Sequence, residues 1–420
     1  MQMTSSDKHN PVSIFIAIDI AKKSHDILIA LPNGRHKIMK IPNSINGYQQ
    51  LIAAANTDAS NITVGFEPTA DYHRNIAYWL HTQGVKCFLI SSLACARARE
   101  MLYKSWDKHD RKDARVILYL MQNNIMQPFY DPLVTNYMDI QELSNTYHQI
   151  SLARTRCQHS LLNHYLTLYF PEMERYFHNS RSEWFCRLLL KFPTPRSMTR
   201  YKKTTFVKRA WEVVGRKVSK QRFLEELYEL AEISIGLPLE IHSVAVDTFK
   251  LQLNRYLALT LQRRELEQKA DQFLHDRDDY QRLRSMPGIG PIIALMVIAE
   301  SGDLKRFRHY RQYLNFCGFN LSAMQSGSRH GAYSLSKRGN ARLRYAFWLA
   351  AVSAIRQREN SFRYKYERYI STNPNDADLK RKARVAAASK MARVAHALVK
   401  QNTDYRGFYE FDCGTSVIGP

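Results

Sequence analysis

Four acidic residues follow or continue apolar stretches of this 420-residue chain. Asp19 follows the apolar run SIFIAI, Glu67 follows the run ITVGF, and a further two acids stand in the octapeptide KHDRKDAR. Carboxylates gathered in one place can hold one or two Mg²⁺ or Mn²⁺ ions, which polarise a phosphodiester and stabilise its attacking and leaving oxygens. The sequence therefore predicts a catalytic and metal-binding set made of Asp19, Glu67, Asp110 and Asp113.

The acids of the octapeptide lie three positions apart, so on a helix Asp110 and Asp113 share one face. The same spacing continues to Ile117 and Leu120, which are apolar, so the two carboxylates extend the stripe that should face a sheet. A carboxylate on the buried side needs a compensating charge. A structural alternative has Asp110 as the helix N-cap and Asp113 three residues on, both favoured by the helix dipole. The pair alone leaves both readings open.

An α/β arrangement is predicted to position these acids. The segments SIFIAI, DILIAL and HKIMKI predict three meandering strands, with Asn33-Gly34 as a two-residue hairpin turn. A helix over GYQQLIAAAN, a strand over ITVGF, a helix over NIAYWLHTQ and a strand over VKCFLI follow, and a long helical region covers residues 93–121. The order βββ-α-β-α-β-α is that of the ribonuclease H fold. In that topology Asp19 and Glu67 end the first and fourth strands.

The chain is strongly basic, with 61 Lys and Arg against 38 Asp and Glu and a formal charge of +23. Its 45% hydrophobic content is that of a folded protein, so a polyanion is the expected partner. No signal-peptide pattern opens the chain, and the longest apolar stretches fall short of the ~18 residues of a membrane span, so a cytoplasmic protein without a membrane partner is expected. Six cysteines without a CxxC pair indicate free thiols and argue against structural zinc.

Three regions are predicted: an α/β domain over 1–128, a helical region over 129–280 and a mainly helical domain over 281–420. Within the middle region, long helices are predicted for 139–170 and 243–276, and the pattern leaves open whether they pair within the chain or form a dimer.

Two basic segments are candidates for contact with a nucleic-acid backbone. The first, RYKKTTFVKRAWEVVGRKVSKQR, has nine bases against one acid. From it we predict contacts by Lys202, Lys203, Lys208 and Arg209. The second is a basic helix over 379–400, whose alanine-rich body could instead pack in a core with the bases at its rim.

The segment SMPGIGP places Gly288 and Gly290 between two helical stretches, the form of a helix-hairpin-helix loop whose backbone N–H groups can receive a phosphate. A plain glycine turn between helices is the structural alternative. The basic charge of the chain favours phosphate binding.

A polar segment further on, MQSGSRHGAYSLSKRGN, contains several serines before a helix that is predicted to begin near Ala341. Ser326 by itself is a turn serine, because a serine hydroxyl needs activation to act as a nucleophile. Lys337 and Arg338 are predicted to contact nucleic acid.

The acidic blocks FIAIDIAKKSHDI, VGFEPTADYHRNIAYWL and KHDRKDAR resemble those of the IS110/IS1111 family of transposases, which is related to the Piv and MooV DNA invertases. The family has a RuvC-like N-terminal domain whose DEDD signature falls here on Asp19, Glu67, Asp110 and Asp113. Glu-Pro-Thr-Ala stands where the family usually has Glu-Ala-Thr-Gly, and Lys-His-Asp where it has Lys-Thr-Asp or Lys-Ser-Asp. These departures leave all four carboxylates in place.

The segments QSGS and SLSKRGNARLR resemble the Ser-Gly and Ser-Lys-Arg-Gly-Asn-like blocks of the family's C-terminal domain, although the family's upstream proline is missing from GFNLSAM. This resemblance implies that Ser326 is a nucleophile that forms a phosphoserine link with DNA. It also implies Mg²⁺ or Mn²⁺ as cofactor, element ends and target as DNA partners, and a homo-oligomer (dimer or tetramer) with a shared active site at the bacterial nucleoid. Some members choose sites with a structured guide RNA.

Three functions are compatible with the residues. The combination of blocks favours a transposase or site-specific recombinase. A metal-dependent junction nuclease would use the four carboxylates with water and no serine. A non-catalytic nucleic-acid-binding protein would be indifferent to both metal and acids.

Overall fold

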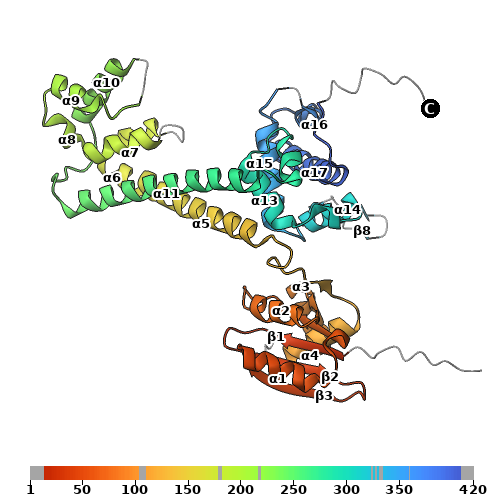
Figure 1. The fold of residues 1–420 in the computed structure, drawn as a ribbon. Helices are drawn as coiled ribbons and strands as arrows, with labels where there is room; N and C mark the ends of the chain where they lie inside the picture. The colour runs from red at the N-terminus through yellow and green to blue at the C-terminus, as the bar shows by residue number, and fades with distance from the viewer. Residues whose placement is uncertain are drawn as a thin grey trace, which may run out of the picture. The chain divides into compact units, whose positions relative to one another are not determined.

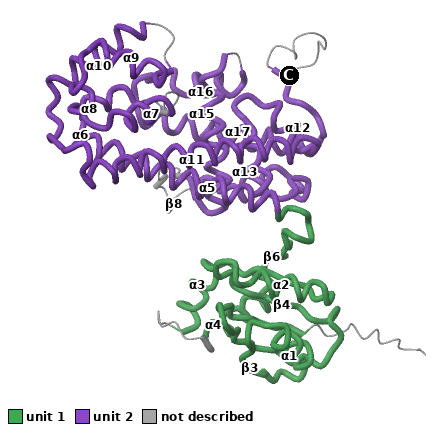
Figure 2. Tube along the Cα trace, turned by 60° about the vertical axis from the view of Figure 1, so that its left-hand side comes forward, with its two compact units in different colours: residues 1–138 green, residues 139–420 purple. Residues whose placement is uncertain are grey.

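The computed structural model describes residues 14–103, 110–177, 182–215, 219–322, 325–326, 329–330, 334–358 and 360–407 of the chain. Contacts divide the chain into two compact units, residues 1–138 and residues 139–420 (Figure 2). Helices of the predicted middle and C-terminal regions both fall in the second unit, and the three-domain division at residues 128 and 280 stays a prediction.

A six-stranded sheet with helices on both faces forms the first unit (Figure 1). The strands are β1 (Ile14–Asp19), β2 (Ser24–Ala30), β3 (His36–Pro42), β4 (Ile62–Phe66), β5 (Lys86–Leu89) and β6 (Gln127–Pro128). The helices are α1 (Ile45–Ala55), the 3₁₀ turn η1 (Ala59–Asn61), α2 (His73–Thr82), α3 (Ser92–Tyr103) and α4 (Asp110–Gln122).

The strand order is β3-β2-β1-β4-β5-β6. Strand β1 runs antiparallel to β2 and parallel to β4, and β4 runs parallel to β5. Three meandering strands followed by two parallel strands on the far side of β1 make the ribonuclease H arrangement, with the short β6 added at the edge. The prediction of an α/β RNase H-like, RuvC-like N-terminal domain is confirmed.

Strand β1 is apolar on both sides because both faces of the sheet are covered. Its even-numbered residues Ile14, Ile16 and Ile18 pack in a core with α1 and α2. Ala17 belongs to a second core, which contains residues of α3 and α4. Odd-numbered positions of β1 therefore point towards α3 and α4.

The hairpin between β2 and β3 differs from the predicted two-residue turn. The backbone N–H of Leu31 donates to Arg35 O, so Pro32, Asn33 and Gly34 form a three-residue loop. Gly34 takes the left-handed conformation at φ 76°. A three-residue loop that closes with a left-handed glycine is a common alternative to the two-residue turn.

The predicted helical region 93–121 consists of two helices, α3 and α4, which pack against each other. A single helix of that length would extend roughly 44 Å, whereas strands of four to seven residues span only about 13–23 Å. Two helices side by side cover such a short sheet.

Gly65, in the middle of β4, allows α4 to approach the sheet. A Cβ atom at this position would lie 2.4 Å from Met121 Sδ of α4. Met121 is fully buried in the core that α4 forms with β1 and β2. The glycine thus sets the distance between the sheet and the helix that carries the predicted acid pair.

The second unit is almost entirely helical (Figure 1). Its first part holds α5 (Met138–Ser160), the π-helical η2 (Leu161–Leu166), α6 (Thr167–Tyr169), the 3₁₀ η3 (Pro171–Tyr176), α7 (Ser182–Lys191), α8 (Pro195–Thr199), α9 (Lys203–Ala210), α10 (Lys220–Glu232) and α11 (Val244–Leu274). Its second part holds α12 (Asp278–Arg284), α13 (Pro291–Ser301), η5 (Leu304–Arg306), α14 (Tyr310–Cys317), β7 (Leu321–Ser322), β8 (Gln325–Ser326), β9 (Arg329–His330), β10 (Ser334–Leu335), α15 (Ala341–Ala354), α16 (Ser361–Ile370) and α17 (Ala377–Gln401).

The long helices α5 and α11 lie side by side and antiparallel within the chain (Figure 1). Tyr147 of α5 donates to Glu267, Arg154 donates to the Tyr256 hydroxyl at 2.6 Å, and Cys157 contacts Gln252 O. Positions on α11 fall as those on α5 rise, which defines the antiparallel sense. Of the two arrangements that the pattern left open, the internal hairpin is present.

The far end of this helical hairpin carries a core of its own. Aromatic and aliphatic side chains of α7 to α10 pack there against η2, α6 and the first half of α11. The basic segment predicted from the sequence is thus part of a folded helical subdomain.

The last part of the unit is centred on α13, α15 and α17. The loop 285–290 joins α12 to α13, so the predicted position of the glycine loop between two helices is confirmed. Alanines of α17, among them Ala387, Ala388 and Ala392, are fully buried. The alanine-rich body of this basic helix is therefore packing surface.

No helix in the described ranges is both long enough and apolar enough to cross a membrane.

We expect Gly65→Ala to lower the free energy of opening of the sheet by about 1–3 kcal/mol, because the added methyl group would overpack the contact with Met121. Hydrogen exchange of the β4 amides measures this. In a Met121→Ala background the same substitution should cost almost nothing, whereas an equal cost in both backgrounds would show that the contact is not the cause. Gly290→Ala, at a glycine with open space around it, is the control.

Candidate active site

Asp19 and Glu67 lie at neighbouring positions of two adjacent parallel strands. The last paired residues of β1 and β4 are Ile18 and Phe66, and the two acids come directly after them. Ala17 and Gly65, two residues earlier, face α3 and α4, so side-chain alternation directs both carboxylates to that side. The structure thus brings these two predicted residues together.

A third carboxylate, which the sequence analysis missed, stands in the same row. Asp26 of β2 pairs directly with Asp19, so the two side chains point to the same face. Lys40 of β3 is the next residue across, and its Nζ lies 3.3 Å from Asp26 Oδ2. The sequence did contain a signal for Asp26, because it is the first residue of DILIAL and the register of the hairpin places it opposite Asp19.

Helix α3 contributes two further side chains that the sequence analysis missed. Cys95 and Arg99 lie four residues apart and therefore share one helix face. Burial raises the pKa of the Cys95 thiol, and the Glu67 carboxylate, with which the thiol is hydrogen-bonded, raises it further. Cys95 is thus a neutral thiol held against a predicted catalytic acid.

Arg99 binds Asp113 of α4. Its Nε and Nη2 both contact Asp113 Oδ1, at 2.7 and 2.6 Å. The two side chains are only 13% and 10% exposed, so the pair is largely withdrawn from water. Asp113 does lie on the buried face of its helix, as the spacing predicted, and the guanidinium supplies its counter-charge.

The structure has α4 begin at Asp110, whose side chain lies outside the described residues. Oxygen donors such as Asp19, Glu67 and Asp113 suit Mg²⁺ or Mn²⁺, so their chemistry fits a divalent ion. Among the side chains that the structure describes, however, no three metal-binding groups converge on one point. The chemistry of these donors therefore fits a divalent ion, and binding of the ion by Asp19, Glu67, Asp110 and Asp113 remains a prediction.

Ser326 stands in a narrow arm between α14 and α15. Two short antiparallel pairs build the arm: β7 with β10 at its base and β8 with β9 towards its tip. Ser326 pairs with Arg329 in the outer pair, while its side chain lies outside the described residues. The predicted nucleophile and the four acids thus belong to different compact units.

The two ends of the arm meet at a pair of glycines. Gly318 and Gly339 have φ values of 76° and 141°, which favour glycine. A Cβ atom on Gly339 would lie 2.6 Å from Gly318 N, and one on Gly318 would lie 2.3 Å from an Arg344 nitrogen. The next residue, Asn340, donates its N–H to Phe316 O at 2.7 Å. Only glycines allow the chain to close here.

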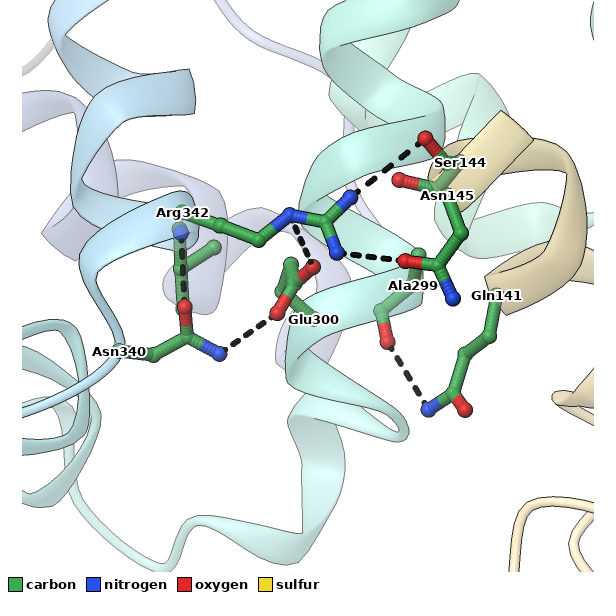
Figure 3. Close-up of polar contacts among 8 residues, drawn as sticks. Gln141, Ser144, Asn145, Ala299, Glu300, Asn340 and Arg342 are labelled. Atoms are coloured by element: carbon green, nitrogen blue, oxygen red, sulfur yellow. Dashed lines mark hydrogen bonds and ion pairs between the residues drawn. The ribbon is translucent and has the colours of Figure 1, made fainter. Parts of the chain in front are cut away.

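Glu300 of α13 anchors the base of the serine arm through two contacts (Figure 3). One carboxylate oxygen accepts from Asn340 Nδ2 at 2.8 Å, and the other forms an ion pair with Arg342 Nε at 3.0 Å. Asn340 Oδ1 also caps α15 by accepting from Leu343 N. Arg342 extends the network to α5 by donating to Asn145 Oδ1 and to the Ser144 carbonyl.

Two family models match the chain. One, for DEDD transposases of IS110 type, matches residues 16–171, and one described as "Transposase IS116/IS110/IS902 family" matches residues 280–367. The first range contains all four predicted acids, and the second contains Ser326. The chain belongs to the IS110 family of transposases.

Curated relatives agree with this membership. The IS110-family chain is 32% identical over 187 residues to the transposase of IS1111A from Coxiella burnetii. This alignment covers 44% of this chain and 50% of that protein. It is 25% identical over 365 residues to a Streptomyces coelicolor mini-circle protein named as a transposase for IS117, covering 82% and 84%. The chain thus spans half the length of the first relative.

A solved structure of T. thermophilus RuvC in complex with a Holliday junction substrate is also similar, at 9% identity and a TM-score of 0.19. It covers 28% of this chain and 99% of RuvC. The assignment of the fold rests on the strand order described above.

The predicted nucleic-acid contacts of this IS110-family chain lie in three places. Gly288 is buried, and a Cβ atom there would lie 2.4 Å from Ala350 O, so close packing on α15 explains its identity. Gly290 has open space around it and lines a cavity of 730 Å³ together with Arg154 and Arg263. Lys337 and Arg338 are exposed beside the base of the arm. Their contact with nucleic acid stays a prediction.

The four cations of the helical subdomain that are predicted to contact nucleic acid differ in their surroundings. Lys202, Lys208 and Arg209 are exposed, and Arg209 lies over the ring of Tyr201. Lys203 forms an ion pair with Glu229 at 2.6 Å. Exposed cations on a folded surface suit backbone phosphates, and these contacts also stay predictions.

Arg99→Met should destabilise the first unit by about 3–5 kcal/mol, because it leaves the buried Asp113 carboxylate without its counter-charge. Hydrogen exchange of β1 and β4 amides reports this loss. Arg97→Met, on the same helix with a side chain 72% exposed, should cost about 0–1 kcal/mol. Adding Asp113→Leu to Arg99→Met should recover most of the loss. Equal costs for the two arginines would contradict the role assigned to the pair.

Glu300→Gln should loosen the base of the arm, because a neutral amide replaces the ion pair with Arg342. We expect roughly tenfold faster exchange of the Asn340 and Ser336 amides, equivalent to about 1.4 kcal/mol. The control is Glu367→Gln, which breaks the exposed surface pair with Arg363. Unchanged exchange in Glu300→Gln would rule out this anchoring.

Proposed function

We propose that this chain cuts and rejoins DNA as the transposase of an IS110-type insertion sequence. One arrangement carries the proposal: Asp19 and Glu67 leave adjacent parallel strands towards the helices between which Asp113 is buried. Carboxylates gathered at one edge of a sheet suit metal-assisted phosphoryl transfer. Membership of a transposase family supports DNA as the substrate.

Asp19, Glu67, Asp110 and Asp113 would hold Mg²⁺ or Mn²⁺. A bound ion would polarise the phosphodiester and neutralise charge on its oxygens. Arg99 keeps one oxygen of Asp113 engaged and so fixes the orientation of that carboxylate.

In the proposed reaction Ser326 Oγ attacks the phosphorus of the scissile phosphodiester. The Oγ–P bond forms as the hydroxyl proton passes to a base, and the P–O bond to the leaving strand breaks as that oxygen takes up a proton. The resulting phosphoserine ester keeps the free energy of the broken bond for rejoining. Lys337 and Arg338, exposed beside the arm, are suited to hold the neighbouring phosphates.

DNA of the element ends and of the target is the proposed partner, and the excess of cations suits it. A structured guide RNA and a dimeric or tetrameric assembly belong to the same proposal and come from the family resemblance. Action on bacterial DNA would place the protein in the cytoplasm at the nucleoid.

A metal-dependent nuclease is the second candidate function. It is favoured by one observation, that Asp19, Glu67 and Asp113 all belong to the first compact unit and need no residue of the second. In that case water replaces Ser326 as the nucleophile.

The two functions differ in whether a covalent intermediate forms. The full-length protein is incubated with Mg²⁺, nicked or gapped element-end DNA and RNA transcribed from the element's flanks. A DNA-linked peptide that contains Ser326 is expected on a denaturing gel with peptide mapping. Ser326→Ala and Asp113→Asn should each reduce the adduct by about 10³-fold or more.

Ser336→Ala, a second serine of the same arm, is the matched control and should keep the adduct. Cleavage that persists in Ser326→Ala without any adduct would replace the transposase proposal with the nuclease.

A further inference from the structure

A second concave surface lies in the C-terminal part, between the helix that precedes the serine arm and the last helix of the chain. It has a volume of 460 Å³ and is formed by the start of α14 and the C-terminal half of α17. Its lining consists of Arg308, His309, Tyr310, Arg393, Val394, His396, Ala397, Lys400 and Gln401. Residues 393, 397 and 400 follow helical spacing, so α17 contributes one continuous stripe.

The two walls of this pocket are fixed to each other by hydrogen bonds. The buried His396 contacts Phe307 O through Nε2 at 2.9 Å, and its ring stacks on Tyr313 with centroids 5.8 Å apart. Lys400 Nζ donates to Arg308 O. The backbone before α14 is therefore held on α17, and the pocket is part of the folded core.

The charge of the pocket has one sign. Arg308, Arg393 and Lys400 line it, and its lining contains no carboxylate. In the described part of the chain none of these three cations forms an ion pair with an acid. Concentrated positive charge without internal compensation is the electrostatic pattern of an anion site.

Neighbouring lysines add to this charge. Burial lowers the pKa of Lys365, and the cations of Arg393 and Arg368 lower it further. Burial likewise lowers the pKa of Lys390, together with Lys365 and Arg393. Lys365 and Lys390 therefore stand close enough to Arg393 to add positive charge beside the pocket.

Two aromatic rings stand in the wall beside the cations. The rings of His309 and Tyr310 have centroids 4.4 Å apart, and Arg393 lies 5.9 Å from the Tyr310 ring centroid. His309 is exposed and Tyr310 is half-buried, so a planar group entering the pocket can reach them. Cations that follow a backbone together with rings that stack on bases are the usual elements of single-strand binding sites.

We propose that this pocket binds a single-stranded segment of nucleic acid, with backbone phosphates on Arg308, Arg393 and Lys400 and an unstacked base on Tyr310. The inference rests on the proposed function only in that nucleic acid is the partner. Arg308 and Tyr310 lie within the second family match, and Arg393 and Lys400 lie beyond its end at residue 367.

The test uses the full chain and fluorescent 20-nucleotide strands of thymidine (DNA) or uridine (RNA), with binding measured by anisotropy over a range of NaCl concentrations. Arg393→Gln should weaken binding of at least one strand about five- to tenfold at low salt and reduce the salt slope by about 0.7, the value for one lost phosphate contact. Tyr310→Leu should weaken it about tenfold with the slope unchanged.

The matched control is Arg255→Gln, which removes the same charge from an exposed position on α11, outside both candidate basic segments and outside the pocket. Three results would overturn the proposal. Pocket variants could bind like Arg255→Gln, they could lose binding to duplex DNA equally, or millimolar inorganic phosphate could abolish strand binding by the wild-type protein. Loss on DNA, on RNA or on both supports the proposal and identifies the strand.

Failure of the proposed recombination can be told apart from failure of this inference. If no Ser326 adduct forms but strand binding still depends on the pocket residues, the recombination proposal fails and the pocket proposal stands. If the adduct forms but the pocket variants bind strands like the control, the pocket proposal fails and the recombination proposal stands.

Discussion

A carboxylate withdrawn from water needs a counter-charge where it lies, and this requirement governs the edge of the sheet where the acids gather. Asp113 continues the apolar face with which α4 covers the sheet, and Arg99 of α3 compensates it through two contacts to one oxygen. The same face of α3 presents Cys95 to Glu67. Gly65 completes the arrangement by allowing α4 to approach β4. Packing and charge compensation thus act on the same two helices.

The serine arm is organised by a different means. Pairs of two-residue strands bury little surface, so the arm owes its position to its base. There Gly318 and Gly339 permit a close backbone approach, and Asn340 joins α13, α14 and α15 in one network with Glu300. The segment that contains Ser326 is therefore carried on a small element, while the helices around it define where that element begins and ends.

The cations of the chain lie in two kinds of structural environment. Arg99 and Arg342 serve inside the fold as partners of Asp113 and Glu300. Other cations, such as Lys208 and Arg393, are exposed on helices whose apolar faces are buried. The net charge of the chain does not distinguish cations that stabilise the fold from exposed ones. The interaction partners of each side chain do distinguish them.

The sequence by itself determined the order of strands and helices along the chain, the positions of Asp19 and Glu67 after their strands, and the buried face of Asp113, because alternation and helical spacing are local properties of the chain. It also suggested the two long helices but not their pairing, which depends on contacts between residues about a hundred positions apart. Tertiary structure alone decided that α3 and α4 are separate, that Arg99, Cys95 and Asp26 join the acids, and that Gly288 faces α15. Each of these features depends on contacts between segments that are distant in sequence, and the residue pattern of one segment does not predict such contacts.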